Sequence, residues 1–147
     1  MGQGSCIVAG TVVWTTRGLR RIETLRAGDV VLTYPDGPPL GVATRPAAAI
    51  DPSRFRLLTL ALKKSPTQQI NIHLLRSLDW IEDYGAHVGG SVFLDMPEMG
   101  AEGLAEVLSI EPCPEIEAGA GRIVTGTFAH TSGEVCVLPV SVQELVL

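Results

Sequence analysis

The chain has 147 residues, enough for one domain with a sizeable core, and 46% of them are hydrophobic while 18% are charged. This composition is typical of a globular domain and excludes a disordered chain. The net charge of −5, with no run of Lys or Arg longer than two residues, disfavours a nucleic-acid partner. No apolar stretch is long enough to cross a bilayer, and the start MGQGSC lacks the apolar segment of a signal peptide.

Short β-rich segments, separated by turns rich in Gly, Pro and Asp, follow one another along the chain. We expect strands over Thr11–Thr15, Val30–Tyr34, Phe55–Leu62, Gln69–Leu75, Ser91–Leu94, Ala105–Ile110, Arg122–Phe128 and Glu134–Val140. One helical turn is expected at Ile22–Leu25, and helical periodicity is otherwise nearly absent. The pattern predicts an all-β fold, compact and curled on itself.

An internal repeat divides this pattern into two halves. The stretch LRAGDVVLTYPDG at 25–37 resembles AHVGGSVFLDMPEMG at 86–100, with Gly28 and Gly89 offset by 61 residues. Each copy has a Gly turn, apolar β residues and a turn of Pro, acidic residue and Gly. Two similar lobes with a cleft between them are expected, and the cleft is where a site would lie.

Cysteine and histidine supply the candidate reactive groups of the sequence. Three of each occur: Cys6, Cys113, Cys136, His73, His87 and His130. They form no CxxC, HxxxH or HExxH pattern, so we expect neither a disulfide framework nor a zinc site. Nothing in the sequence supports a diffusible cofactor. At least one cysteine is expected to be free, which draws attention to Cys6 at the start of the β pattern.

Residues 6–34, CIVAGTVVWTTRGLRRIETLRAGDVVLTY, carry an ordered motif. It consists of a cysteine, a small-Gly-Thr turn at 9–11, a strand, a Gly turn at Gly18, Ile-Glu-x-Leu at 22–25 and Gly-Asp-x-Val-Leu at 28–32. This order resembles the opening block of Hint domains, the module shared by inteins and hedgehog autoprocessing domains. The resemblance implies a horseshoe-like Hint fold of two pseudo-symmetric β lobes over residues 6–147. Residues 1–5 would be a leader or the remnant of an upstream segment.

The chemistry that this resemblance implies can be rebuilt from Cys6. A thiolate is a good nucleophile toward an acyl carbon, so Cys6 would attack the carbonyl of Ser5 and convert the amide into a thioester. The fold must then stabilise the oxyanion and protonate the departing amide nitrogen, which calls for a histidine.

His73, in QINIHLLRSLDW, resembles the histidine of the second Hint block, and Leu74 and Leu75 after it look hedgehog-like. In that block the histidine polarises the scissile amide and a Thr stands three residues before it. Here Ile70 takes the place of the Thr, which removes one hydrogen bond to the amide. Asn71 is a poor substitute because its side chain points to the other face of the strand. The alternative for His73 is a histidine satisfied in the core.

Two further residues take roles only through the hedgehog resemblance. Asp51, in AAAIDPSRF, would be the general base that activates the acceptor hydroxyl or water; its alternative is an Asx turn at Asp-Pro. The segment GTFAHTSGEVCVLPV resembles the closing hedgehog segment, in which Cys136 would tune the redox state of Cys6 or form a transient disulfide with it. A buried core cysteine is the alternative. His130 lies near the closing hairpin, from which it would approach the site.

The asparagine content of the sequence decides between splicing and self-cleavage among the reactions of Hint domains. Splicing needs a C-terminal Asn, and the only asparagine is Asn71, so an intein reaction is excluded. We expect a self-cleaving domain, acting in cis on an upstream segment, whose thioester passes to a sterol or other alcohol, water or a thiol. The alternatives are a Hint-fold scaffold or interaction module with lost processing, and a domain that releases an attached toxin or adhesin. A monomer is expected, with the secretory pathway or the extracellular space implied for a hedgehog-like parent.

Overall fold

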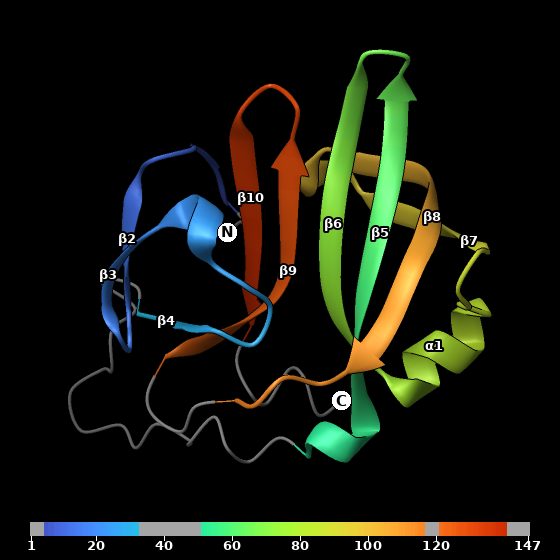
Figure 1. The fold of residues 1–147 in the computed structure, drawn as a ribbon, viewed down its shortest axis with the longest axis horizontal. Helices are drawn as coiled ribbons and strands as arrows, with labels where there is room; N and C mark the ends of the chain where they lie inside the picture. Colours follow the sequence, from blue (N-terminus) through green and yellow to red (C-terminus); the bar gives the residue numbers. More distant parts are fainter. Residues whose placement is uncertain (1–4, 33–50, 117–120, 141–147) are drawn as a thin grey trace.

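The computed structural model describes residues 5–32, 51–116 and 121–140, and within them the all-β expectation is confirmed (Figure 1). The strands are β1 (Ser5–Val8), β2 (Val12–Thr15), β3 (Gly18–Arg21), β4 (Val30–Val31), β5 (Phe55–Ser65), β6 (Gln68–Ser77), β7 (Ser91–Met96), β8 (Ala101–Pro112), β9 (Arg122–His130) and β10 (Glu134–Val140). Short 3-10 turns η1 (Ile22–Thr24), η3 (Pro52–Arg54) and η4 (Pro97–Met99) and one helix, α1 (Leu78–Tyr84), join them.

Each strand expected from the sequence has a counterpart in the structure; β5, β6, β7, β8 and β9 run longer than predicted, and β4 ends at Val31. The expected strand Val30–Tyr34 begins with β4, while its residues 33–34 lie outside the described residues. The sequence missed β1, β3 and α1. The helix has seven residues, too few for a periodic pattern, and it is defined by its ends: Ser77 Oγ accepts the Trp80 N–H, and Gly85 takes the left-handed conformation.

The middle six strands of the sheet are arranged symmetrically, in keeping with the internal repeat. Among the described residues the strand order is β3-β2-β4-β9-β6-β5-β8-β7, so β6 and β5 form the centre, flanked by β9 and β8 and then by β4 and β7. The remaining four described strands all extend one half: β2 and β3 follow β4, while β10 pairs with β9 and β1 pairs with β10. All pairings are antiparallel.

The two repeat turns make the same backbone hydrogen bonds. In the Gly28-Asp29 turn, the first N–H donates to Val124 O and the second carbonyl accepts from Val124 N–H, both at 2.8 Å. The Gly89-Gly90 turn repeats this with Val107, at 2.9 Å in both bonds. Both leading glycines have positive φ, 101° and 88°, a backbone region that glycine enters at little cost. The weak sequence repeat therefore reflects a real structural duplication.

Alternation along the central strands separates two faces of the sheet. In β6, Ile70, Ile72 and Leu74 are fully buried on one face, whereas Asn71 and His73 are exposed on the other. The buried face joins the largest core cluster, which also contains Phe128 and Cys136. None of the helices in the described ranges is long and apolar enough to span a membrane.

Candidate functional site

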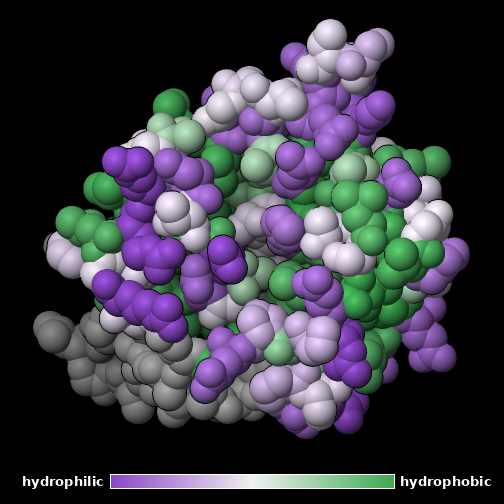
Figure 2. All heavy atoms as spheres, viewed as in Figure 1, coloured by the Kyte–Doolittle hydropathy of each residue, from purple (hydrophilic) through white to green (hydrophobic). Residues whose placement is uncertain are grey.

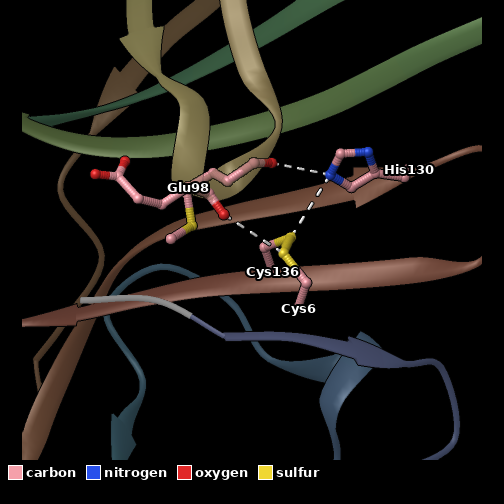
Figure 3. The surroundings of a disulfide bond; sticks show 5 residues. Cys6, Glu98, His130 and Cys136 are labelled. Atoms are coloured by element: carbon pink, nitrogen blue, oxygen red, sulfur yellow. Dashed lines mark hydrogen bonds between the residues drawn. A yellow bond between two sulfur atoms is a disulfide. The ribbon is translucent and has the colours of Figure 1, made fainter. Parts of the chain in front are cut away.

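Cys6 and Cys136 meet in a disulfide (Figure 3). They occupy directly paired positions of β1 and β10, and Cys136 is paired in turn with Phe128 of β9. Cys136 is fully buried, whereas Cys6 is exposed and lines a cavity of about 390 Å³. The resemblance implied this pairing as one role for Cys136, and the strand register shows why it forms.

His130 is the histidine beside the sulfur atoms. Its Nε2 lies 3.6 Å from Cys136 Sγ and 3.0 Å from the carbonyl oxygen of Met99. Because a carbonyl only accepts, Nε2 carries the proton and donates it. The β9–β10 hairpin produces this placement: Phe128 is paired with Cys136, and His130, two residues further on, shares its face.

The η4 turn completes the surroundings of the disulfide. The carbonyl oxygen of Glu98 lies 3.8 Å from Cys6 Sγ, and Figure 3 shows His130 and the sulfur atoms facing this turn. A disulfide sulfur has no proton, so this contact becomes an S–H···O bond only after reduction. The two neighbours then act on different sulfur atoms: the Glu98 carbonyl favours the neutral thiol of Cys6, and the His130 N–H favours the thiolate of Cys136.

The cavity at Cys6 is polar at its rim. Its lining residues are Cys6, Lys64, Gln68, Gln69, Ile70, Pro97, Glu98, Met99, Gly100, His130, Thr131, Ser132 and Glu134. Ile70, which stands where the Hint pattern has Thr, is directly paired with His130 and so lies within this cavity. In the part of the chain that the structure describes, no group of three or more His, Cys, Asp or Glu side chains is placed to hold a metal.

His73 does not reach Cys6, contrary to expectation. It follows Ile72, which lies on the face of the sheet that carries Cys136, so its own side chain points to the opposite face. Its backbone is separated from that of Ser5 by three inter-strand steps, through Thr127 and Val137, which is about 14 Å. The structure therefore does not bring His73 into contact with the Ser5–Cys6 bond.

Asp51 also lies away from Cys6, and the structure confirms its alternative as an Asx turn. Its carboxylate caps η3, accepting from Ser53 N–H at 3.0 Å and Ser53 Oγ at 2.7 Å. These bonds, that from the Ser53 hydroxyl first, hold the pKa of Asp51 below its usual value, which weakens it as a base. Asp51 precedes β5, and the Cys6 cavity lies near Lys64, about 30 Å along that strand.

Cys113 has no contact with the disulfide. It is the free cysteine of the described residues, half-buried in a segment between two prolines. Its Sγ lies 3.3 Å from the carbonyl oxygen of Pro114, and burial raises the pKa of its thiol. A raised pKa leaves little thiolate at neutral pH, so Cys113 keeps the structural interpretation that the sequence gave it.

The environment of His73 predicts a measurable titration. Although the side chain is exposed, neighbouring atoms partly desolvate the ring; this desolvation lowers its pKa below the ordinary 6.5, while Glu111 raises it and Arg26 lowers it. We expect its imidazole to titrate below 6.5 by NMR, further below in Glu111→Gln, and closer to 6.5 in Arg26→Gln. Because the two charges act in opposite senses, shifts of the same sign in both variants would contradict the arrangement. Glu106→Gln, on the same strand β8, is the control that should leave the titration unchanged.

Comparison with protein-family models, with curated proteins and with solved structures finds no match to this chain. The functional interpretation therefore depends on the motif of residues 6–34 and on the geometry at Cys6. Sequence reasoning placed His130 only near the closing hairpin and gave the proton-transfer role to His73. The tight turn at 131–133 was the signal that pairs Phe128 with Cys136 and brings His130 to the sulfur atoms.

Proposed function

We propose that the chain is a self-cleaving autoprocessing domain in which reduction of the Cys6–Cys136 disulfide releases Cys6 as the nucleophile. The observation that carries the proposal is the position of Cys6: it is exposed at a cavity that His130 also lines, His130 contacts its disulfide partner Cys136, and its strand pairs with β10 alone among the described strands. His130 takes the proton-transfer role first expected of His73.

The proposed reaction has three steps: reduction of the disulfide, transfer of the acyl group to Cys6, and cleavage of the thioester. A dithiol or phosphine supplies two electrons and reduces the disulfide to two thiols, and the Cys6 thiol passes its proton to the neutral imidazole of His130. The thiolate attacks the Ser5 carbonyl carbon; the C–N bond to Cys6 breaks, and the departing nitrogen takes that proton from the His130 imidazolium to become a free amine. An external water, thiol or alcohol, a sterol among them, then attacks the thioester, releasing the upstream segment and regenerating the thiol.

The surroundings of Cys6 suit these steps. The His130 Nε2–H lies 3.6 Å from Cys136 Sγ and stabilises negative charge on the sulfur pair, and the imidazole can relay the proton of the Cys6 thiol to the leaving nitrogen. Ile70 lines the cavity at the position where the Hint pattern has a Thr. Because Ile70 cannot make the hydrogen bond that this Thr would give to the scissile amide, we expect slow cleavage. Water and small nucleophiles can enter, since Cys6 is exposed.

A second candidate function is a scaffold or interaction module with lost processing. It is favoured by the same disulfide, which occupies both sulfur atoms, and by the separation of His73 and Asp51 from Cys6. In a scaffold, the disulfide would only anchor β1 to β10. Release of an attached toxin or adhesin would use the same cleavage chemistry and differ only in what lies upstream.

A fusion experiment separates cleavage from a purely structural role. A folded reporter is joined ahead of Ser5, and the oxidised fusion is treated with a trialkylphosphine, with hydroxylamine, or with both. The phosphine opens the disulfide and hydroxylamine intercepts a thioester, so only the combination is expected to release the reporter rapidly. Mass spectrometry should find a hydroxamate on Ser5 and a free amino group on Cys6.

A matched control variant and two contradicting results complete the fusion experiment. Cys113→Ala keeps the reactive pair and should cleave like the unaltered fusion. An intact fusion after prolonged treatment with both reagents would overturn the proposal and leave the scaffold. Cleavage at any bond other than Ser5–Cys6 would also overturn it.

A further inference from the structure

A second, larger cavity lies on the face of the sheet opposite to Cys6. It has a volume of about 810 Å³, in the range of small-molecule sites. Strands β5, β6, β9 and β10 form its floor, and the segment 17–29 forms one wall. Figure 2 shows this face, where hydrophilic side chains gather over β3 and η1, with a hollow toward β6.

Two opposite charges act on the middle of this cavity. His73, Arg26 and Glu111 all line the cavity, and the Arg26 charge lowers the pKa of His73 while the Glu111 charge raises it. Within the described residues, these two charged groups form neither an ion pair nor a hydrogen bond with each other or with other side chains. Both line the cavity and are exposed, which leaves them available to a ligand.

The other two carboxylates of the lining are already occupied by the backbone. Glu23 Oε1 accepts the Gly10 N–H at 2.6 Å, and Asp29 Oδ2 accepts the Arg26 N–H at 2.8 Å. These bonds hold one oxygen of each carboxylate to the wall. Glu111 is the carboxylate of the lining for which no such bond is found in the described residues, so both of its oxygens are open to a cation.

The floor between Arg26 and Glu111 offers hydrogen bonds and apolar contact. Thr59 Oγ1 lies 3.2 Å from His73 Nδ1, which orients the imidazole. Asn71 Oδ1 accepts from Gln69 Nε2 at 2.8 Å, so its own amide N–H groups are the donors that remain for a ligand. Apolar side chains complete the lining: Leu25, Ala27, Leu57, Ala129 and Val135.

We propose that this cavity binds an amino-acid-like zwitterion with an apolar side chain, of about dipeptide size, with its carboxylate at Arg26 and its ammonium at Glu111. A guanidinium is well suited to a carboxylate because it presents two parallel N–H donors. An ammonium group fits the Glu111 carboxylate, and the aliphatic part of the ligand covers the apolar lining. The site is separate from the sulfur chemistry and does not depend on the proposed cleavage.

The test uses leucyl-leucine as the probe and the whole chain in its oxidised form. In a titration followed by ¹⁵N NMR, saturable shifts are expected at the amides of Asn71, His73 and Thr127. N-acetyl-leucyl-leucine lacks the ammonium, and leucyl-leucine amide lacks the carboxylate; each should bind at least about tenfold more weakly. Absence of saturable shifts at these amides, or equal binding of all three probes, would overturn the proposal.

Two variants assign each charge to its partner. Arg26→Gln should weaken leucyl-leucine and abolish the preference over its amide, while Glu111→Gln should abolish the preference over the acetylated form. Arg54→Gln and Glu106→Gln alter exposed residues outside the cavity and should bind like the unaltered chain. Unchanged preferences in both cavity variants would reject the assignment. The oxidised chain cannot cleave itself, so this result is independent of the fusion experiment.

Discussion

Replacing His130 with alanine is expected to slow reporter release from the fusion by about a hundredfold or more, whereas His73→Ala should leave it within about twofold. The reason is distance: the His130 Nε2 lies 3.6 Å from Cys136 Sγ, while His73 is on the opposite face of the sheet. Cys6→Ala is expected to abolish release, since an N–S acyl shift at Ser5–Cys6 needs the thiol of residue 6 itself, and Cys136, although adjacent, is on another strand and fully buried. Gel densitometry after phosphine and hydroxylamine treatment gives the rates.

Comparing the His130 and His73 variants also tests which guide to the proton-transfer residue is right, the family resemblance or the geometry of the structure. The family resemblance selects His73, and the geometry selects His130. Both variants must first be shown to retain the thermal midpoint of the unaltered chain, since His130 also bonds the Met99 carbonyl and its loss loosens the η4 turn. If a folded His73→Ala variant lost cleavage while a folded His130→Ala variant kept it, the role proposed for His130 would be wrong.

The fold was largely predictable from local patterns. Period-two alternation and Gly/Pro turns located the long strands, and the offset between Gly28 and Gly89 predicted the two halves that Val124 and Val107 close in the same way. The missed elements are those with little local signal. Strand β3 contains a glycine and two arginines, and it is a strand because β2 pairs with it.

The site was less predictable, because it depends on the register of strands far apart in sequence. Motif matching selected His73 by its neighbours in the chain, but the alternation of Ile70, Ile72 and Leu74 already assigned it to the face away from the core. Counting back from the 131–133 turn would have paired Cys136 with Phe128 and placed His130 on the same face. The pairing of Cys6 with Cys136 joins the two ends of the sequence, and only the resemblance suggested it.

Reduction of the disulfide is expected to lower the free energy of unfolding by about 2–5 kcal/mol. The bond closes a loop between residues 130 apart in sequence, and loop-closure entropy for that length gives about 5 kcal/mol as the upper end. The measurement is urea unfolding with and without a phosphine. Cys113→Ala should show the same difference, and the double variant Cys6→Ala/Cys136→Ala should match the reduced chain with no response to phosphine. Equal midpoints for oxidised and reduced chains would contradict the prediction.

The size of this loss bears directly on the proposed cleavage. Domains are stable by about 5–15 kcal/mol, so a loss of 2–5 kcal/mol leaves the reduced chain folded in most of that range. What changes locally is β1, which among the described strands is held by its four-residue ladder with β10 and by the disulfide. Without the disulfide, the Ser5–Cys6 bond rests on that short ladder and can move toward the freed thiolate. Reduction would therefore supply the nucleophile and release its target in one step, provided that the other strands stay folded, which the same urea experiment measures.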